Sequence, residues 1–188
     1  QLILGWMYNE GEGVPQDYAK AVEWYTKSAN QGNAEAQHSL GRMYSNGNGV
    51  RQDYAKAKQW IEKAATQGGS DAQFSFGVLY YQGEGVPQNY AKAVEWYTKS
   101  ANQGYAKAQF ILGWMYNEGE GVPQDYTKAK QWYEKAANQG DADAQFRLGW
   151  MYYNAQGVRQ NTATAKEWFD KSCDNGNQDG CDNYRKLN

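Results

Sequence analysis

Only a few side chains in this sequence can do chemistry beyond packing and charge pairing. The two cysteines, Cys173 and Cys181, stand eight residues apart on either side of Gly176. If one helix ends at this glycine and another begins after it, the thiols face each other across a hairpin and could reach disulfide distance. Two reduced thiols packed in the hairpin are the alternative. Two cysteines and one histidine are too few for a zinc site, so we expect no metal.

His38 is the only histidine, so a Ser-His-Asp triad would have to converge on it. Its counterparts at intervals of 36 residues are large and apolar, which favours a packing role: Leu2, Phe74, Phe110 and Phe146. The sequence has no Ser-x-x-Lys, Ser-Asp-Asn or Lys-Thr-Gly motif, and its Gly-x-Gly stretches lack the lysine and hydroxyl residue of a phosphate-binding loop. We therefore predict no catalytic residue and no cofactor.

Composition narrows the class of protein further. The chain has 188 residues, with 21 glycines, 16 tyrosines and 8 tryptophans, and a mean hydropathy of −0.97. The length fits one domain, and the aromatic content argues against disorder. The net charge of −2 lacks the basic excess of a nucleic-acid-binding protein. We therefore expect no nucleic-acid partner. No run approaches the roughly 20 apolar residues that cross a bilayer, so we expect no transmembrane segment. No signal peptide is visible.

The sequence repeats every 36 residues without a change of register. Residues 3–18 recur unchanged as residues 111–126. One glycine and one tryptophan mark each copy, at Gly5, Gly41, Gly77, Gly113 and Gly149 and at Trp24, Trp60, Trp96, Trp132 and Trp168. A fixed period of this length is typical of a solenoid built from stacked repeats.

Each repeat contains two runs of apolar residues at helical spacing, separated by a glycine-rich loop such as residues 46–50. This pattern predicts a helical hairpin. Pro15, Pro87 and Pro123 follow the loops, and we expect the second helices to begin there, where a missing N–H is tolerated. We place the repeats at about 1–32, 33–68, 69–104, 105–140 and 141–176, with a cap at 177–188, in a single domain over 1–188.

The unit Ala-x-Ala-Gln-x-x-Leu-Gly-x-x-Tyr-x-x-Gly-x-Gly-Val-x-Gln-Asp-Tyr-x-Lys-Ala-x-x-Trp, from Ala34 to Trp60, resembles the Sel1-like repeat, a relative of the tetratricopeptide repeat. The resemblance implies an all-α, right-handed superhelical α-solenoid of five 36-residue helix-turn-helix repeats plus a C-terminal capping helix. In cysteine-rich secreted members, pairs spaced like Cys173 and Cys181 bridge adjacent helices. The resemblance therefore implies a disulfide and a periplasmic or secreted location, with a cytoplasmic location as the alternative.

Positions that vary between repeats and share one helix face are the candidate binding surface of a solenoid. The third, sixth and tenth positions of each repeat vary and have i, i+3, i+7 spacing on the first helix. The adjoining ninth position also varies, and holds Asn9, Ser45, Tyr81, Asn117 and Tyr153. By the resemblance, first helices line a concave face. The predicted partner-binding residues are Trp6, Glu10, Arg42, Tyr81, Trp114, Glu118, Arg147, Trp150 and Tyr153. Packing of the three tryptophans on neighbouring helices is the alternative.

The resemblance implies a non-catalytic scaffold or adaptor for protein complexes, commonly in bacterial signalling, envelope or host-interaction settings. We expect a monomer that binds a protein or peptide partner as a helix or an extended segment in its groove. Some members of the family are described as penicillin-binding or β-lactam-hydrolysing. The alternative is therefore a cell-wall-related enzyme, or a binder of a small ligand such as a β-lactam or a peptidoglycan fragment.

Overall fold

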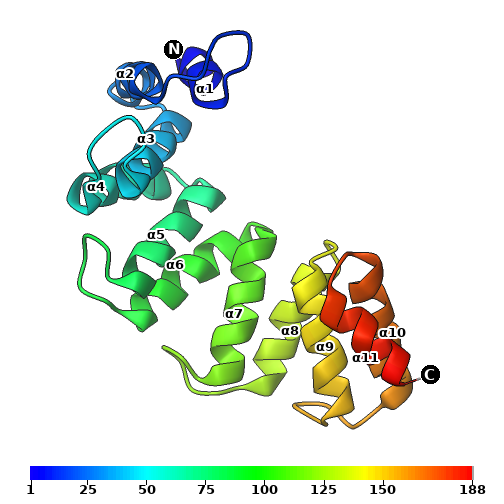
Figure 1. Ribbon diagram of the computed structural model, residues 1–188. Helices are drawn as coiled ribbons and strands as arrows, with labels where there is room; N and C mark the ends of the chain where they lie inside the picture. Colours follow the sequence, from blue (N-terminus) through cyan, green and yellow to red (C-terminus); the bar gives the residue numbers. More distant parts are fainter. Residues whose placement is uncertain (188) are drawn as a thin grey trace. The chain divides into compact units, whose positions relative to one another are not determined.

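The computed structural model describes residues 1–187, and this part of the chain folds into eleven α-helices without a β-strand (Figure 1). The helices are α1 (Leu2–Glu10), α2 (Tyr18–Ala29), α3 (Ala34–Asn46), α4 (Tyr54–Thr66), α5 (Ser70–Gln82), α6 (Tyr90–Asn102), α7 (Ala106–Glu118), α8 (Tyr126–Ala137), α9 (Ala142–Tyr153), α10 (Thr162–Asp174) and α11 (Gln178–Lys186). The predicted all-α repeat fold with five helical hairpins and a C-terminal capping helix is confirmed.

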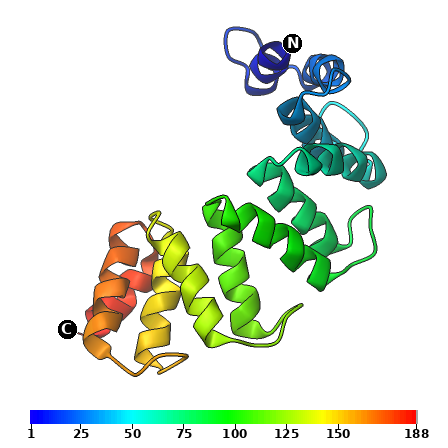
Figure 2. The ribbon, with the colours of Figure 1, turned by 180° about the vertical axis from the view of Figure 1, so that it is seen from behind.

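The described residues form two compact units, Gln1–Trp96 and the chain from Tyr97 onward, with the boundary inside α6. In the first unit, α1 packs with α2, α2 with α3, α3 with α4, and α4 with α5. In the second unit, α7 packs with α8, α8 with α9, α9 with α10, and α10 with α11. Figure 2 shows the α9–α10 pair with α11 beside it. Each unit is thus a stack of hairpins in which these helices pack on their neighbours in sequence.

The second helices begin three residues later than predicted. They start at Tyr18, Tyr54 and Tyr126, three residues after the position that holds proline in three of the repeats. An aspartate caps each of these helices. The Asp17 carboxylate accepts a hydrogen bond from the Lys20 backbone N–H at 3.0 Å, and such a cap satisfies an N–H that has no partner within the helix. The prolines therefore belong to the connecting loop.

A glycine in the middle of each first helix sets how closely the two helices of a hairpin approach. A Cβ atom added to Gly113 would lie 2.5 Å from the ring of Tyr133, and one added to Gly41 would lie 2.5 Å from Ile61. Contacts of this length are sterically forbidden, so only glycine admits the large buried side chain of the second helix. This contact explains why the glycine recurs in every repeat.

Buried glutamines join consecutive hairpins. The Gln145 side chain donates to the Ala137 backbone carbonyl at 3.0 Å and accepts from the Asn175 side chain at 3.0 Å. The same arrangement links Gln37 to the Ala29 carbonyl at 3.1 Å. In each case a first helix is attached to a carbonyl at the end of the preceding second helix, a group that the helix itself leaves without a partner.

The last loop keeps the shape of the other loops despite its departure from the pattern. Ala155 replaces a glycine and adopts φ +56°, and it is the only non-glycine residue with positive φ among residues 1–187. Its counterpart in the preceding repeat, Gly119, has φ +76°. Left-handed backbone is strained for alanine because its Cβ approaches the carbonyl oxygen.

We predict that Ala155→Gly raises the free energy of unfolding by about 0.5–1 kcal/mol, because relief of the left-handed strain outweighs the extra flexibility of glycine in the unfolded chain. Gly119→Ala is the matched control and should lower the free energy of unfolding by a similar amount. Urea denaturation followed by circular dichroism measures both. A destabilised Ala155→Gly protein would contradict the strain argument.

Candidate functional site

Two similar pockets lie on the first helices, one in each unit. The first pocket has a volume of about 120 Å³ and is lined by Asn9, Glu10, Tyr25, Ser39, Arg42 and Met43, among others. The second pocket has a volume of about 260 Å³ and is lined by Asn117, Glu118, Tyr133, Arg147, Trp150 and Met151, among others. Each is bounded by the first and second helices of one repeat and the first helix of the next.

The repeat explains why the pockets correspond. Glu10 and Glu118, like Tyr25 and Tyr133, are separated by 108 residues, which is three periods of 36. Equivalent positions in a repeat fold occupy equivalent places in the hairpin, so the same side chains meet again three repeats later. The pockets differ where the sequence differs, because Ser39 and Arg42 in the first correspond to Arg147 and Trp150 in the second.

An asparagine beside each glutamate orients its carboxylate. The Asn9 side chain donates to Glu10 Oε1 at 2.6 Å, and the Asn117 side chain donates to Glu118 Oε1 at 2.8 Å. The loop supports this end of the helix, because the Gln124 side chain donates to the Asn117 backbone carbonyl at 2.7 Å. One oxygen of each glutamate is thus held in place, and the exposed carboxylate can accept further hydrogen bonds from a ligand.

A tyrosine from the second helix contributes to each pocket. Burial raises the pKa of Tyr25, and its hydrogen bond with the Ser39 hydroxyl opposes this effect. Burial raises the pKa of Tyr133 further, with the Arg147 charge acting against it and the Glu118 charge in the same direction. The Tyr133 hydroxyl is buried and has no hydrogen-bond partner among residues 1–187. This hydroxyl is thus enclosed by protein atoms beneath the second pocket, where the charges of Arg147 and Glu118 act on it.

The structure brings five of the nine predicted partner-binding residues into these pockets. Glu10 and Arg42 line the first, and Glu118, Arg147 and Trp150 line the second. Within the second unit, the Trp150 ring contacts the rings of Phe146, Tyr153 and Phe169 edge-on. Trp150 is therefore a half-buried, rigidly held wall of the pocket rather than a free side chain.

The other four predicted residues lie elsewhere on the units. Trp6 on α1 and Tyr153 at the end of α9 are 44% and 39% exposed. The Tyr81 ring packs against the Tyr90 ring at 5.2 Å between centroids. Trp114 is half-buried and packs against the cluster of buried residues on α8 and α9, as the packing alternative described. The pockets do not include any of these four side chains.

Sequence reasoning missed the pocket tyrosines. Tyr25 and Tyr133 occupy a position that also holds Ile61 and Phe169, so its content resembles a core position. The hydroxyl group could have distinguished these two residues from ordinary core residues. A buried tyrosine usually has a hydrogen-bond partner, whereas isoleucine and phenylalanine need none. Asn9 and Asn117 belong to the variable ninth position, from which only Tyr81 and Tyr153 are among the predicted partner-binding residues.

His38 is buried as predicted but is also hydrogen-bonded on both sides. Its Nε2 lies 2.8 Å from the Ser75 hydroxyl, and its Nδ1 lies 3.0 Å from the Asp71 carboxylate. The hydrogen bond and charge of His38 lower the pKa of Asp71 to about 2. Ser75 lies inside α5, where backbone N–H groups already donate within the helix and cannot form an oxyanion hole. We interpret the three residues as a polar link between α3 and α5.

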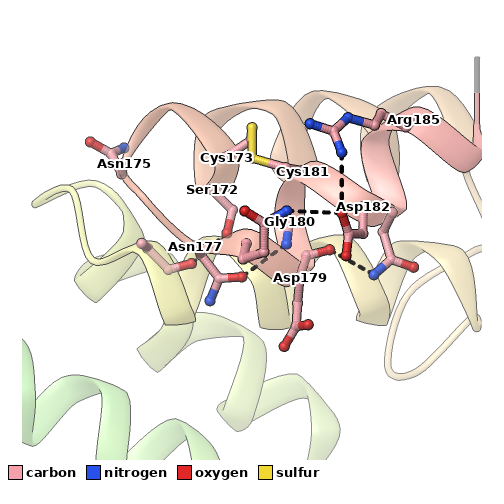
Figure 3. The surroundings of a disulfide bond; sticks show 12 residues. Ser172, Cys173, Asn175, Asn177, Asp179, Gly180, Cys181, Asp182 and Arg185 are labelled. Carbon is pink, nitrogen blue, oxygen red and sulfur yellow. Dashed lines mark hydrogen bonds and ion pairs between the residues drawn. A yellow bond between two sulfur atoms is a disulfide. The ribbon is translucent and has the colours of Figure 1, made fainter.

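The two cysteines form a disulfide, which confirms the bridge between adjacent helices (Figure 3). Cys173 lies near the end of α10 and Cys181 in the first turn of α11, with 4.5 Å between their Cα atoms. Between them, the Asn177 side chain accepts from the Gly180 backbone N–H at 2.8 Å and caps α11. A Cβ on Gly180 would lie 2.7 Å from the Ser172 hydroxyl, so the two helices pack closely here.

Stacked helical hairpins of constant length define a helical-repeat protein of the α-solenoid class. The model of the Sel1 repeat matches residues 1–33, 34–69, 70–105, 106–141 and 142–177. The chain belongs to the Sel1 repeat family, whose members are commonly protein-interaction scaffolds. Within residues 1–187, no helix is both long and apolar enough to cross a membrane.

Several solved structures are similar. A protective antigen of uropathogenic Escherichia coli strains that displays an SLR fold is 42% identical over 99% of this chain, with a TM-score of 0.96, and this chain spans 40% of that protein. A Sel1 repeat protein from Oxalobacter formigenes is 34% identical over 99% of this chain and 74% of its own, with a TM-score of 0.88. Helicobacter pylori cysteine rich protein B is 29% identical over 70% of this chain and 94% of its own, with a TM-score of 0.55. No curated protein matched the chain.

We predict that His38→Phe, which inserts the residue found at this position in other repeats, reduces the acid sensitivity of the fold. The pKa of Asp71 is lowered from 3.8 to about 2 in the folded state. Its ionised carboxylate therefore stabilises the fold above pH 3.8, and this contribution is lost as the pH falls through about 2. Because Asp71 is about half exposed, we expect a contribution of about 1 kcal/mol. Urea denaturation of both proteins between pH 2 and 6 measures it, and equal pH profiles would refute the link.

We predict that replacing both cysteines with serine lowers the free energy of unfolding by about 2–3 kcal/mol, because the bridge restrains a short loop of the unfolded chain. Hydrogen exchange should accelerate in α11, whereas α3 in the first unit serves as an internal control and should exchange at the wild-type rate. In the wild type, a thiol-alkylating reagent should label neither cysteine until a reductant is added. Two thiols labelled without reductant would contradict the disulfide.

Proposed function

We propose that this chain is a non-catalytic protein-interaction scaffold that holds a peptide or protein partner on its first helices. The recurrence of one pocket in both units supports this proposal most directly. An enzyme needs its reacting groups at a single centre, whereas a long polypeptide offers the same backbone chemistry at many points. A site built twice from repeated positions suits an extended partner better than one small substrate.

The side chains of the pockets suit a polypeptide. The oriented carboxylates of Glu10 and Glu118 can accept backbone N–H groups, and the exposed Arg42 and Arg147 can donate to carbonyl or carboxylate oxygens. Trp150 adds a rigid aromatic wall, and tryptophan and arginine are enriched among residues that dominate binding energy at interfaces. The exposed Trp6 and Tyr153 extend the proposed surface beyond the pockets.

A binder of a small cell-wall ligand, such as a β-lactam or a peptidoglycan fragment, is the second candidate. The second pocket favours it, because an aromatic wall, a carboxylate and a guanidinium converge there. Its volume of about 260 Å³ nevertheless falls below the roughly 300–1,000 Å³ of typical small-molecule sites. Among residues 1–187, moreover, the Ser75–His38–Asp71 link lacks oxyanion donors, so a scaffold remains the better proposal.

We also propose that the chain works in the periplasm or outside the cell. The Cys173–Cys181 disulfide supports this location, because such bonds persist in oxidising compartments and are rare in reducing cytosol. The similarity to a protein described as a protective antigen points the same way.

We predict that the wild type enriches specific sequences from a random library of 12-residue peptides with free termini. Trp150→Ala should weaken the binding of an enriched peptide at least about 10-fold, because it removes a central aromatic anchor. Gln131→Ala on the exposed face of α8 is the control and should leave the dissociation constant unchanged. Isothermal titration calorimetry measures each.

The scaffold proposal fails if no peptide is enriched while the purified protein hydrolyses a β-lactam or a peptidoglycan fragment. It also fails if enriched peptides bind the wild type and the Trp150→Ala protein equally well, because binding would then not use the second pocket.

A further inference from the structure

An asparagine that precedes a glycine can lose ammonia without a catalyst, because the backbone nitrogen of the glycine can attack the side-chain amide. Glycine favours the attack, since it has no Cβ atom to obstruct the approach. The sequence contains three such pairs: Asn46–Gly47, Asn48–Gly49 and Asn175–Gly176. The hydrogen bonds of the glycine N–H groups distinguish these three pairs in the structure.

In two of the pairs, the attacking nitrogen already donates a hydrogen bond. Asn46 is the last residue of α3, and the Gly47 N–H donates to the Met43 carbonyl at 2.9 Å. After α10, the Gly176 N–H donates to the Cys173 carbonyl at 2.9 Å. A backbone nitrogen must give up such a bond before it can attack the neighbouring side chain. The turn at the end of each helix therefore protects its asparagine.

The third pair lacks this protection. The Gly49 N–H has no hydrogen-bond partner among residues 1–187, and the Asn48 side-chain amide has none in that part of the chain either. Gly49 is exposed in the loop between α3 and α4. A Cβ atom added to it would lie 2.3 Å from the Tyr18 carbonyl carbon, so the loop requires glycine after Asn48.

The repeat shows that the fold accepts a carboxylate at the position of Asn48. Three other repeats have a glutamate there: Glu12, Glu84 and Glu120. Asn48 also lines the first pocket, together with Glu10 and Arg42. A carboxylate in place of the Asn48 amide would therefore leave the hairpin intact and add a negative charge to this pocket.

We propose that Asn48 is a site of spontaneous deamidation, through which the first pocket gains a second carboxylate. The Gly49 nitrogen bonds to the side-chain carbonyl carbon of Asn48 while the bond from this carbon to the amide nitrogen breaks. Ammonia leaves with the proton of the Gly49 N–H, and a succinimide ring remains. Water then opens the ring at one of its two C–N bonds, which yields aspartate or isoaspartate.

The test incubates the folded full chain near neutral pH and locates the deamidated residues by tandem mass spectrometry. Trypsin cleavage after Arg42 and Arg51 releases the peptide 43–51, whose fragment ions distinguish Asn46 from Asn48. We expect Asn48 to deamidate at least about 10-fold faster than Asn46 and Asn175, because these two sites must first break a hydrogen bond. In concentrated urea the three rates should agree within about threefold, because the unfolded chain lacks these bonds.

Isoelectric focusing follows the change of charge in the whole protein. The incubated wild type should form an acidic species, and Asn48→Gln should abolish it, because glutamine closes the corresponding larger ring much more slowly. Asn46→Gln is the matched control and should form the acidic species at the wild-type rate. Asn48→Asp should focus with the acidic species and unfold at the wild-type urea midpoint, since three repeats have a carboxylate at this position.

Three results would overturn the proposal. The first is an acidic species that forms as fast in the Asn48→Gln protein as in the wild type. The second is equal deamidation of Asn46 and Asn48 in the folded chain. The third is a rate at Asn48 that rises in urea as much as the rates at the other two asparagines, because the folded loop would then protect Asn48 as well.

Discussion

One buried amide hydrogen bond determines how each hairpin meets the preceding one. Gln145, for example, binds the Ala137 carbonyl, and the other three internal junctions repeat this bond from the same position. At the last junction the same two positions hold Cys181 and Cys173, and a disulfide replaces the hydrogen bond. The bridge is therefore a covalent form of the link that holds every other junction, placed where α11 has no following hairpin within residues 1–187.

This link fixes the spacing of the first helices, and the spacing creates the pockets. The glycine of each first helix brings the second helix so close that its large side chain passes beneath the first, as Tyr133 does below Gly113. Tyr133 is therefore part of the core, with 1% of its surface exposed, and it also lies beneath the second pocket. The residue of the next first helix that acts on this tyrosine differs between the pockets: it is Ser39 for Tyr25 and Arg147 for Tyr133.

The period of 36 residues was sufficient to predict the helices, their pairing and the cap, because each repeated position has one structural role. The starts of the second helices were wrong because the proline rule competed with aspartate capping, and the cap prevailed. Comparing repeats found Glu118, Arg147 and Trp150, which vary on an exposed face. It missed Tyr133, because a nearly constant position implies core, and it missed the bonds of His38, because their partners come from the next repeat.

His38 and the second pocket show two ways in which one repeat can depart from the pattern. His38 replaces an apolar residue and obtains its partners from the protein itself, Ser75 and Asp71, so its polar groups are satisfied and nothing remains for a ligand. The second pocket has Arg147 where the first has Ser39, and the buried Tyr133 hydroxyl has no hydrogen-bond partner among residues 1–187. In such a fold, the surroundings of a substituted residue therefore depend on which side chains the neighbouring repeat places beside it.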